Sequence, residues 1–260
     1  MYNMAVTLFV FLIGICIGSF LNVCIYRMGR EQSIVKPASH CPHCQKPIRW
    51  FDNIPLVSYL VLRGRCRDCG QKISFRYFFV ELLTGLVFLA LFKKFGVSIH
   101  FFAYTILSCG LLVATFVDFD FQIIPDEISL GGIVVGVVLS FIFPLLHLTS
   151  LHLRSLEQSL LGALVGGGVL WILGCIGNFI FKKESMGGGD VKLLAMIGAF
   201  LGWKRTLLVL PVASLIGSVV GIIIKLKTKE SVIAFGPYLS LGALACIFWA
   251  DKILSFFFYF

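Results

Sequence analysis

Residues 4–26 read MAVTLFVFLIGICIGSFLNVCIY, a run of 23 residues without a charged side chain. An α-helix needs about 20 apolar residues to cross the hydrocarbon of a bilayer, so this run predicts a membrane-spanning helix. No basic residue precedes the run, and it contains no short apolar core followed by a small-residue cleavage site. We therefore expect residues 4–26 to be a permanent anchor rather than a removable signal peptide.

The rest of the chain is similarly apolar. Of its 260 residues, 58% are hydrophobic and only 13% are charged, and the mean hydropathy is +0.96. Soluble domains are nearer half apolar. Because backbone polar groups in lipid must be hydrogen-bonded within their own segment, long apolar runs predict helices. The chain is expected to be an all-α polytopic membrane protein of about eight transmembrane helices, with further runs at 77–92, 97–117, 127–146, 158–181, 206–224 and 232–249 and a shorter one at Val191–Trp203.

The net charge of +9 indicates how the chain is oriented in the membrane rather than nucleic-acid binding, because the 22 basic residues are concentrated in the loops of one side. Cytosolic loops are rich in Lys and Arg. With the N-terminus outside, six basic residues lie outside: Lys93, Lys94, Arg154, Lys204, Arg205 and Lys252. The other 16 lie inside: Arg27, Arg30, Lys36, Lys46, Arg49, Arg63, Arg65, Arg67, Lys72, Arg76, Lys182, Lys183, Lys192, Lys225, Lys227 and Lys229.

Residues 27–76 form the one long polar stretch, a predicted cytosolic insert between the first two spans. The insert contains Cys41-Pro-His-Cys44 and Cys66-Arg-Asp-Cys69. Two such C-x2-C pairs can place four thiolates around one tetrahedral zinc ion. Disulfides or idle thiols are the alternative, but disulfides are rare in the reducing cytosol. We expect structural zinc on Cys41, Cys44, Cys66 and Cys69, with His40 and His43 as bystanders, and we expect the five cysteines in apolar spans to pack as small hydrophobes.

Two groups of carboxylates lie at the ends of predicted spans, where ionisable residues are costly and often functional. Asp118 and Asp120 close the third span, and Asp190 follows the Gly187-Gly188-Gly189 run. In the predicted topology both groups lie on the cytosolic side and can meet. Paired carboxylates can share one proton and act as base and acid in peptide hydrolysis. Solvated charges at helix ends are the alternative.

Glu81, inside the second span, is a third ionisable group. It could pair with an arginine such as Arg76, line a cleft, or be a structural glutamate that reaches the membrane interface. The sequence leaves these alternatives open.

Motifs along nearly the whole chain resemble those of bacterial prepilin peptidases, the type IV leader peptidases of the GxGD aspartic membrane protease group. Near the N-terminus they are Gly18-Ser19-Phe20-Leu21-Asn22-Val23, Asn53-Ile54-Pro55-Leu56-Val57-Ser58-Tyr59, Arg63-Gly64-Arg65-Cys66 and Arg76-Tyr77 with Val80-Glu81. Farther along they are Asp118 with Pro125-Asp126, Gly187-x-Gly189-Asp190 and Phe235-Gly236-Pro237-Tyr238. Phe78, where many members have proline, and a longer loop around 147–154 depart from the pattern.

The resemblance implies a bifunctional enzyme of the bacterial inner membrane. Such an enzyme removes the basic leader of type IV prepilins or type II secretion pseudopilins at the cytosolic face, then N-methylates the new N-terminus with S-adenosylmethionine. The resemblance also implies that Asp118 and Asp190 are catalytic, that the four insert cysteines bind the metal and that Gly64 has a role in methyl transfer. On a helix, residues two apart point about 200° apart, so only one of Asp118 and Asp120 can face Asp190.

The corresponding domains are 1–26 for the first helix, 27–76 for the zinc-binding insert and 77–260 for the membrane-embedded protease. The expected partners are pilin precursors and the lipid bilayer, with no nucleic acid. A leader peptidase without methyltransferase activity and a proton-coupled transporter are the alternatives. No glycine-rich S-adenosylmethionine motif is evident, so the sequence leaves the cofactor pocket unassigned.

Overall fold

A computed structural model describes residues 3–182, 186–228 and 234–258, and every expected apolar segment contains a helix in it. The chain divides into two compact units, Met1–Val97 and Ser98–Phe260. No strand is found among the described residues. The all-α prediction is therefore confirmed. Lys183 and Lys229, on which the predicted orientation partly rests, lie outside the described residues.

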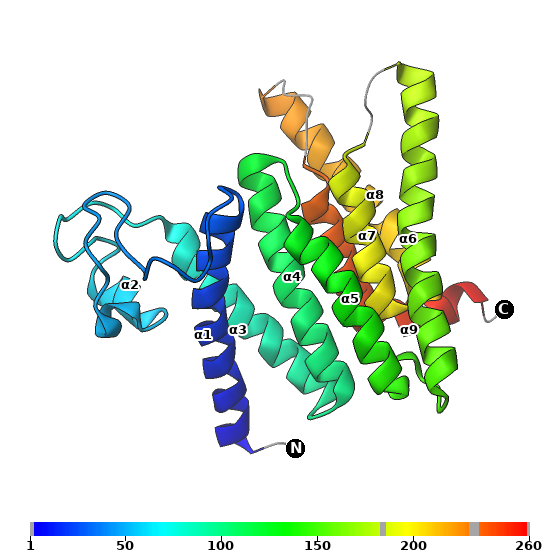
Figure 1. The fold of residues 1–260 in the computed structure, drawn as a ribbon, viewed down its shortest axis with the longest axis horizontal. Helices are drawn as coiled ribbons and strands as arrows, with labels where there is room; N and C mark the ends of the chain where they lie inside the picture. The colour runs from blue at the N-terminus through cyan, green and yellow to red at the C-terminus, as the bar shows by residue number, and fades with distance from the viewer. Residues whose placement is uncertain (1–2, 183–185, 229–233, 259–260) are drawn as a thin grey trace. The chain divides into compact units, whose positions relative to one another are not determined.

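Unit 1 consists of two long helices and the insert that joins them (Figure 1). Its elements are α1 (Met4–Met28), the 3-10 turn η1 (Trp50–Asn53), the short α2 (Val57–Val61) and α3 (Phe75–Phe95). Glycines let α1 and α3 pack closely, since a Cβ on Gly18 would lie 2.8 Å from the Cα of Glu81. At this crossing the Asn22 side chain donates a hydrogen bond to the carbonyl of Tyr77, 3.0 Å away.

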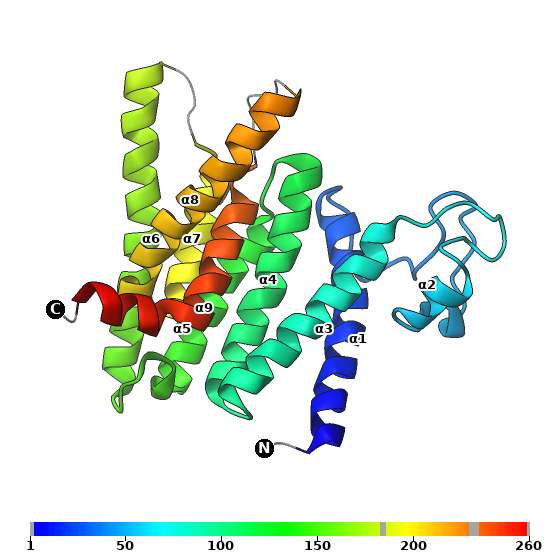
Figure 2. The ribbon, with the colours of Figure 1, turned by 180° about the vertical axis from the view of Figure 1, so that it is seen from behind.

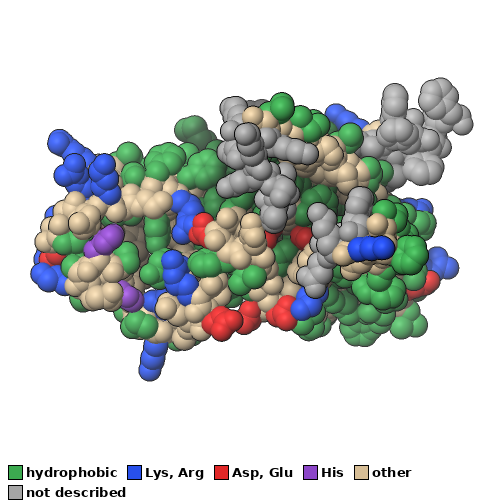
Figure 3. All heavy atoms as spheres, turned by 90° about the horizontal axis from the view of Figure 1, so that it is seen from above, with side chains coloured by type: hydrophobic (Ala, Val, Ile, Leu, Met, Phe, Trp, Pro, Cys, Tyr) green, Lys and Arg blue, Asp and Glu red, His purple; other side chains and the backbone are tan. Residues whose placement is uncertain are grey.

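In the described part of unit 2, six helices run alternately up and down (Figures 1 and 2). The ends of α4, α6 and α8 therefore meet the beginnings of α5, α7 and α9 at one end of the unit. Figure 3 looks onto this end and shows acidic side chains among basic and hydrophobic ones. The elements are α4 (Ile99–Phe121), α5 (Asp126–Ile142), the 3-10 turn η2 (Pro144–His147), α6 (His152–Phe181), α7 (Gly188–Leu201), α8 (Trp203–Thr228) and α9 (Gly236–Phe258).

The short helix α7 is the core of unit 2 and packs against α4, α5, α6, α8 and α9. Its residues Leu193 to Leu201 are buried apart from Ala195. Gly198 faces Gly162 of α6 so closely that a Cβ on either residue would collide with the other's carbonyl oxygen. Small residues allow this kind of close helix packing in membranes. Because protein surrounds α7, its 14 residues need not match the thickness of a bilayer.

In the described part of the chain, five helices have the length and hydropathy to cross a membrane: α1, α3, α4, α6 and α8. An apolar stretch at Gly236–Ala250 in α9 is shorter. α5 ends earlier than the expected 127–146 run because Pro144 has no amide hydrogen and restricts Phe143 to an extended conformation. The predicted total of about eight spans stays a prediction.

Candidate active site and metal centre

Asp118 lies in the last turn of α4 with only 5% of its surface exposed. Its Oδ2 accepts a hydrogen bond from the backbone N–H of Gly236 at the beginning of α9, 3.0 Å away. A Cβ on Gly236 would lie 2.7 Å from the same oxygen, so a larger residue there would displace the carboxylate. α4 ends at Gln122, which adopts the left-handed conformation with φ 55°, and its N–H bonds to the Asp118 carbonyl.

Asp190 lies in the first turn of α7, where the helix dipole favours a negative charge. Its backbone N–H donates to the carbonyl of Gly187, 3.2 Å away. The expected close approach at the glycine run occurs at Gly189, where a Cβ would lie 3.1 Å from that of Ile124. Gly188, in contrast, faces open space. The segment between α4 and α5 therefore packs directly against the beginning of α7.

The beginnings of α7 and α9 both pack on Ile124, which places Asp190 near Asp118, and the two carboxyl groups interact electrostatically. α4 remains helical through Asp120, so Asp118 and Asp120 leave it on different faces. Asp120 is exposed, whereas Asp118 is buried. Two carboxyl groups held close in a shielded site can share one proton between them. This arrangement can supply a base and an acid to one substrate.

Two polar contacts near the pair were not evident from the sequence. Lys192, half a turn beyond Asp190, forms an ion pair of 2.7 Å with Asp126 at the beginning of α5. The hydrogen bond from Gly236 to Asp118 was missed because the residues are far apart in sequence. The only sequence signal for this hydrogen bond was the motif at 235–238, and a motif does not show which residue it contacts.

The two C-x2-C segments of the insert have the same backbone geometry. The N–H of Cys41 bonds to the carbonyl of Lys46, and the N–H of Cys66 bonds to that of Gln71. Each first cysteine also accepts a bond four residues on, from Gln45 or Gly70. Gln45 and Gly70 both have positive φ, 59° and 70°. Each segment is therefore a folded knuckle.

The four knuckle sulfurs form a cluster in which all lie within 4.8 Å of one another. The Sγ atoms of Cys41 and Cys69 are 3.9 Å apart. Zinc bound tetrahedrally to sulfur at about 2.3 Å requires sulfur atoms about 3.8 Å apart, so this cluster fits a zinc ion. His40 and His43 are not part of the cluster. The interpretation of these cysteines as a metal site therefore agrees with their geometry.

Ionic contacts hold the two knuckles within the insert. Lys46 forms an ion pair of 3.5 Å with Asp68 of the second knuckle. Arg67 donates from Nε and Nη2 to the Asp52 carboxylate of η1, and these bonds lower the pKa of Asp52 below its usual value. Backbone N–H groups of Cys69 and Asp68 lower the pKa of the Cys66 thiol to about 7. A thiol with this pKa readily loses its proton when a metal ion binds the sulfur.

Glu81 lines a cavity of unit 1, one of the alternatives that the sequence left open. It is 8% exposed and accepts a hydrogen bond of 2.8 Å from the backbone N–H of Leu56. A second hydrogen bond comes from the Ser19 hydroxyl. Among the described residues Glu81 forms no ion pair, with Arg76 or with any other cation.

Comparison with known proteins assigns each unit to a family domain. A sequence model of the bacterial peptidase A24 N-terminal domain matches residues 12–95, and one of the type IV leader peptidase family matches residues 105–222. A protein of Stutzerimonas stutzeri named prepilin leader peptidase/N-methyltransferase is 35% identical over 97% of this chain and 93% of its own. The chain belongs to the type IV leader peptidase family. The predicted family is therefore confirmed.

Other relatives carry similar names. The Myxococcus xanthus prepilin leader peptidase/N-methyltransferase is 42% identical over 86% of this chain, a match that spans 64% of that protein. An Escherichia coli protein named type 4 prepilin-like proteins leader peptide-processing enzyme is 40% identical over 90% of this chain and 91% of its own. No solved structure matches the chain.

Proposed function

We propose that this protein removes the basic leader peptide of type IV prepilins or pseudopilins and then N-methylates the new N-terminus. Membership of the leader peptidase family and the names of its relatives support both activities. The observation that carries the proteolytic part is the Asp118–Asp190 pair, one member buried on α4 and the other in the first turn of the central helix α7.

In the proposed reaction, the ionised aspartate takes a proton from a water molecule as the water oxygen attacks the scissile carbonyl carbon. The protonated aspartate gives its proton to the carbonyl oxygen. As the tetrahedral intermediate collapses and its carbon–nitrogen bond breaks, the leaving amine takes the proton that the first aspartate removed from water, and a hydroxyl of the intermediate returns a proton to the other aspartate. The N–H of Gly236 holds Asp118 in place but does not take part in these transfers.

For the second activity, bound S-adenosylmethionine would supply the methyl group, and the new N-terminal amine of the pilin would accept it and lose a proton. The four knuckle cysteines would hold a structural zinc ion. A small insert cannot bury much apolar surface, so a metal contributes directly to its folding.

We place both activities at the cytosolic face of the bacterial inner membrane. This proposal rests on the uneven distribution of basic residues between the loops on the two sides of the membrane. The basic residues from Arg27 to Arg76 all lie in the insert. A cysteine introduced at Thr149, between η2 and α6, should react with an impermeant reagent added outside intact cells. One introduced at Glu127, at the beginning of α5, should react only after lysis. The opposite pattern would invert the orientation.

The function is tested with purified enzyme and a prepilin, incubated with and without S-adenosylmethionine, by measuring the mass of the product. We expect loss of the leader in both samples and a further gain of one methyl group when the donor is present. Loss of the leader alone would favour a peptidase without methyltransferase activity. An unchanged prepilin would contradict the proposal and reopen the transporter alternative.

A further inference from the structure

Ile124 lies in the connection 122–125 between α4 and α5, at the end of unit 2 that Figure 3 shows. It is 9% exposed, whereas its neighbour Ile123 is 46% exposed. A hydrocarbon side chain can neither give nor take a proton, so the proposed cleavage assigns Ile124 no chemical step. Its burial beside the aspartate pair can serve the reaction only by fixing where other groups lie.

The backbone of this connection is fixed at both ends. At one end the N–H of Gln122 donates to the carbonyl of Asp118, 2.9 Å away. At the other end the carbonyl of Pro125 accepts hydrogen bonds from the N–H and the hydroxyl of Ser129, 3.1 and 3.2 Å away. Because Ile124 precedes a proline, its backbone is restricted to an extended conformation. The point from which the Ile124 side chain projects is therefore fixed.

The Ile124 side chain contacts the two places at which the catalytic aspartates are held. Its base meets Gly189, the residue before Asp190, where an added Cβ would lie 3.1 Å from the Ile124 Cβ. Its tip meets Gly236, where an added Cβ would lie 3.2 Å from the Ile124 Cδ1. The N–H of Gly236 holds the Asp118 carboxylate. Ile124 thus lies between the backbone that carries Asp190 and the backbone that holds Asp118.

We propose that Ile124 is a positioning residue of the peptidase, whose side chain sets the separation between the Asp118 and Asp190 carboxyl groups. Protein interiors are packed so closely that the loss of one methyl group is felt by its neighbours. A catalytic group misplaced by about 1 Å can lose about 10²-fold in rate. The inference rests on the proposed cleavage by this aspartate pair.

Ile124→Val is the sharpest test because it removes Cδ1 alone. Cδ1 is the atom that meets Gly236, whereas the Cβ and Cγ1 atoms that face Gly189 remain. We expect kcat for prepilin cleavage to fall about three- to tenfold while KM stays unchanged, because the contact orients the catalytic groups and does not bind substrate. Ile124→Ala removes every atom beyond Cβ and should lose about 10²-fold.

Ile123 supplies the matched control. It is adjacent to Ile124 in the same connection, but its side chain is exposed. Ile123→Val and Ile123→Ala delete the same atoms and should cleave at the rate of the unaltered protein. Losses equal to those of the Ile124 variants would mean that the connection as a whole matters and that the Ile124 side chain has no special role, which would overturn the proposal.

A double variant separates positioning from a loss of stability. The methyl group added by Gly236→Ala would lie 2.7 Å from Asp118 Oδ2 and 3.2 Å from Ile124 Cδ1. Without Cδ1 this methyl group has room to move away from the carboxylate. Ile124→Val combined with Gly236→Ala should therefore cleave faster than the product of the two single losses predicts. Changes that act independently would multiply, as we expect when Ile123→Val is combined with Gly236→Ala.

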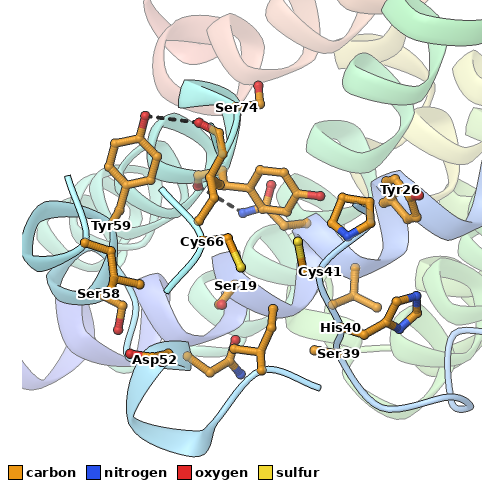
Figure 4. Close-up of a pocket in the computed structure, with 18 of the residues that line it drawn as sticks. Ser19, Tyr26, Ser39, His40, Cys41, Asp52, Ser58, Tyr59, Cys66 and Ser74 are labelled. Atoms are coloured by element: carbon orange, nitrogen blue, oxygen red, sulfur yellow. Dashed lines mark hydrogen bonds between the residues drawn. The ribbon is translucent and has the colours of Figure 1, made fainter. Parts of the chain in front are cut away.

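The rates are measured on purified full-length protein with a prepilin, by the mass of the product. Zinc content serves to equalise the samples, because the substitutions lie in unit 2 and leave unit 1 unchanged. Figure 4 shows the cavity of unit 1, lined by residues between 19 and 81, with Tyr59 and Tyr26 on opposite sides and Cys41 and Cys66 between them. None of its lining residues is altered in these variants.

Two results would overturn the proposal while leaving the proposed cleavage intact. One is a normal rate for Ile124→Val and for Ile124→Ala. The other is a double variant with Gly236→Ala whose loss equals the product of the single losses. Ile124→Val loses one methyl group only, so it decides the question even where Ile124→Ala does not fold. An unaltered protein that leaves the prepilin intact would instead contradict the proposed function, and with it the basis of this inference.

Discussion

The two units hold their functional groups by different means. In unit 1 the four cysteines come from two knuckles, each a few residues long and closed by its own backbone hydrogen bonds. In unit 2 Asp118 and Asp190 come from helices separated by α5 and α6, and packing around α7 brings them together. Each knuckle needs only its own few residues to fold, whereas the aspartate pair depends on the whole helix bundle. Changes to each unit should therefore affect different activities.

The largest effect is expected from Asp118→Asn. Asn is nearly the same size as Asp but cannot act as a base or share an acidic proton, so cleavage should fall by about 10²–10⁴-fold. Methyl transfer to a pilin supplied already cut should remain, because that step needs no general acid at the peptide bond. Mass spectrometry of both products measures the two rates. Asp120→Asn is the matched control, since Asp120 is exposed on another face of α4. Cleavage that survives in Asp118→Asn and vanishes in Asp120→Asn would contradict the choice of aspartate.

Removal of a knuckle cysteine should have the next largest effect, in the other unit. Elemental analysis of the unaltered protein should find close to one zinc ion per chain, and Cys66→Ser should lose it. Methyl transfer should then fall at least as much as cleavage, because the insert loses the metal that holds it. Cys16→Ser, in the same unit but outside the cluster, should retain zinc. A metal-free protein active in both steps would rule out the structural role.

A smaller loss of cleavage is expected from Gly236→Ala. The added Cβ would meet the Asp118 carboxylate, shift it and lengthen the hydrogen bond from residue 236. A misplaced catalytic group can reduce the rate by up to about 10²-fold. Gly131→Ala in α5 adds the same methyl group where no atom lies within 4 Å, so it should cleave normally. Equal rates for the two variants would mean that Gly236 does not position Asp118.

The smallest effect is expected from Lys192→Met. The Lys192–Asp126 ion pair is partly exposed, with 40% and 56% of the two side chains accessible, and such pairs contribute about 0.2–1 kcal/mol. Thermal unfolding should therefore move by only a few degrees, and cleavage should change less than in Gly236→Ala. A collapse of cleavage without loss of stability would show that Lys192 acts on the catalytic pair itself.

The fold and the clustering of the four cysteines could be predicted largely from the sequence because their signals are local. Each apolar run became a helix, and the two C-x2-C spacings became a sulfur cluster. Helix ends were less predictable: Pro144 ended α5 early, and α4 continued through Asp118 and Asp120 to Phe121. The position of α7 inside its unit could not be predicted, because a short apolar run does not reveal what surrounds it.

The remaining features of the site depend on contacts between distant residues. Gly236 donates to Asp118, and Leu56 donates to Glu81, through backbone groups that carry no sequence signal. The cavity beside Glu81 forms only when α1, the insert and α3 come together. The proposed domain limits of 26/27 and 76/77 and the catalytic roles of Asp118 and Asp190 stay predictions.

The most direct test of the account is the rate of prepilin cleavage in Asp118→Asn, Asp190→Asn and the double variant, measured on samples with equal zinc content. If the two carboxyl groups act as one unit, each single variant should fall to nearly the same low rate, and the double variant should fall no further. Losses that multiply in the double variant would mean that the aspartates act independently. An Asp190→Asn variant that cleaves at a normal rate would contradict the central claim outright.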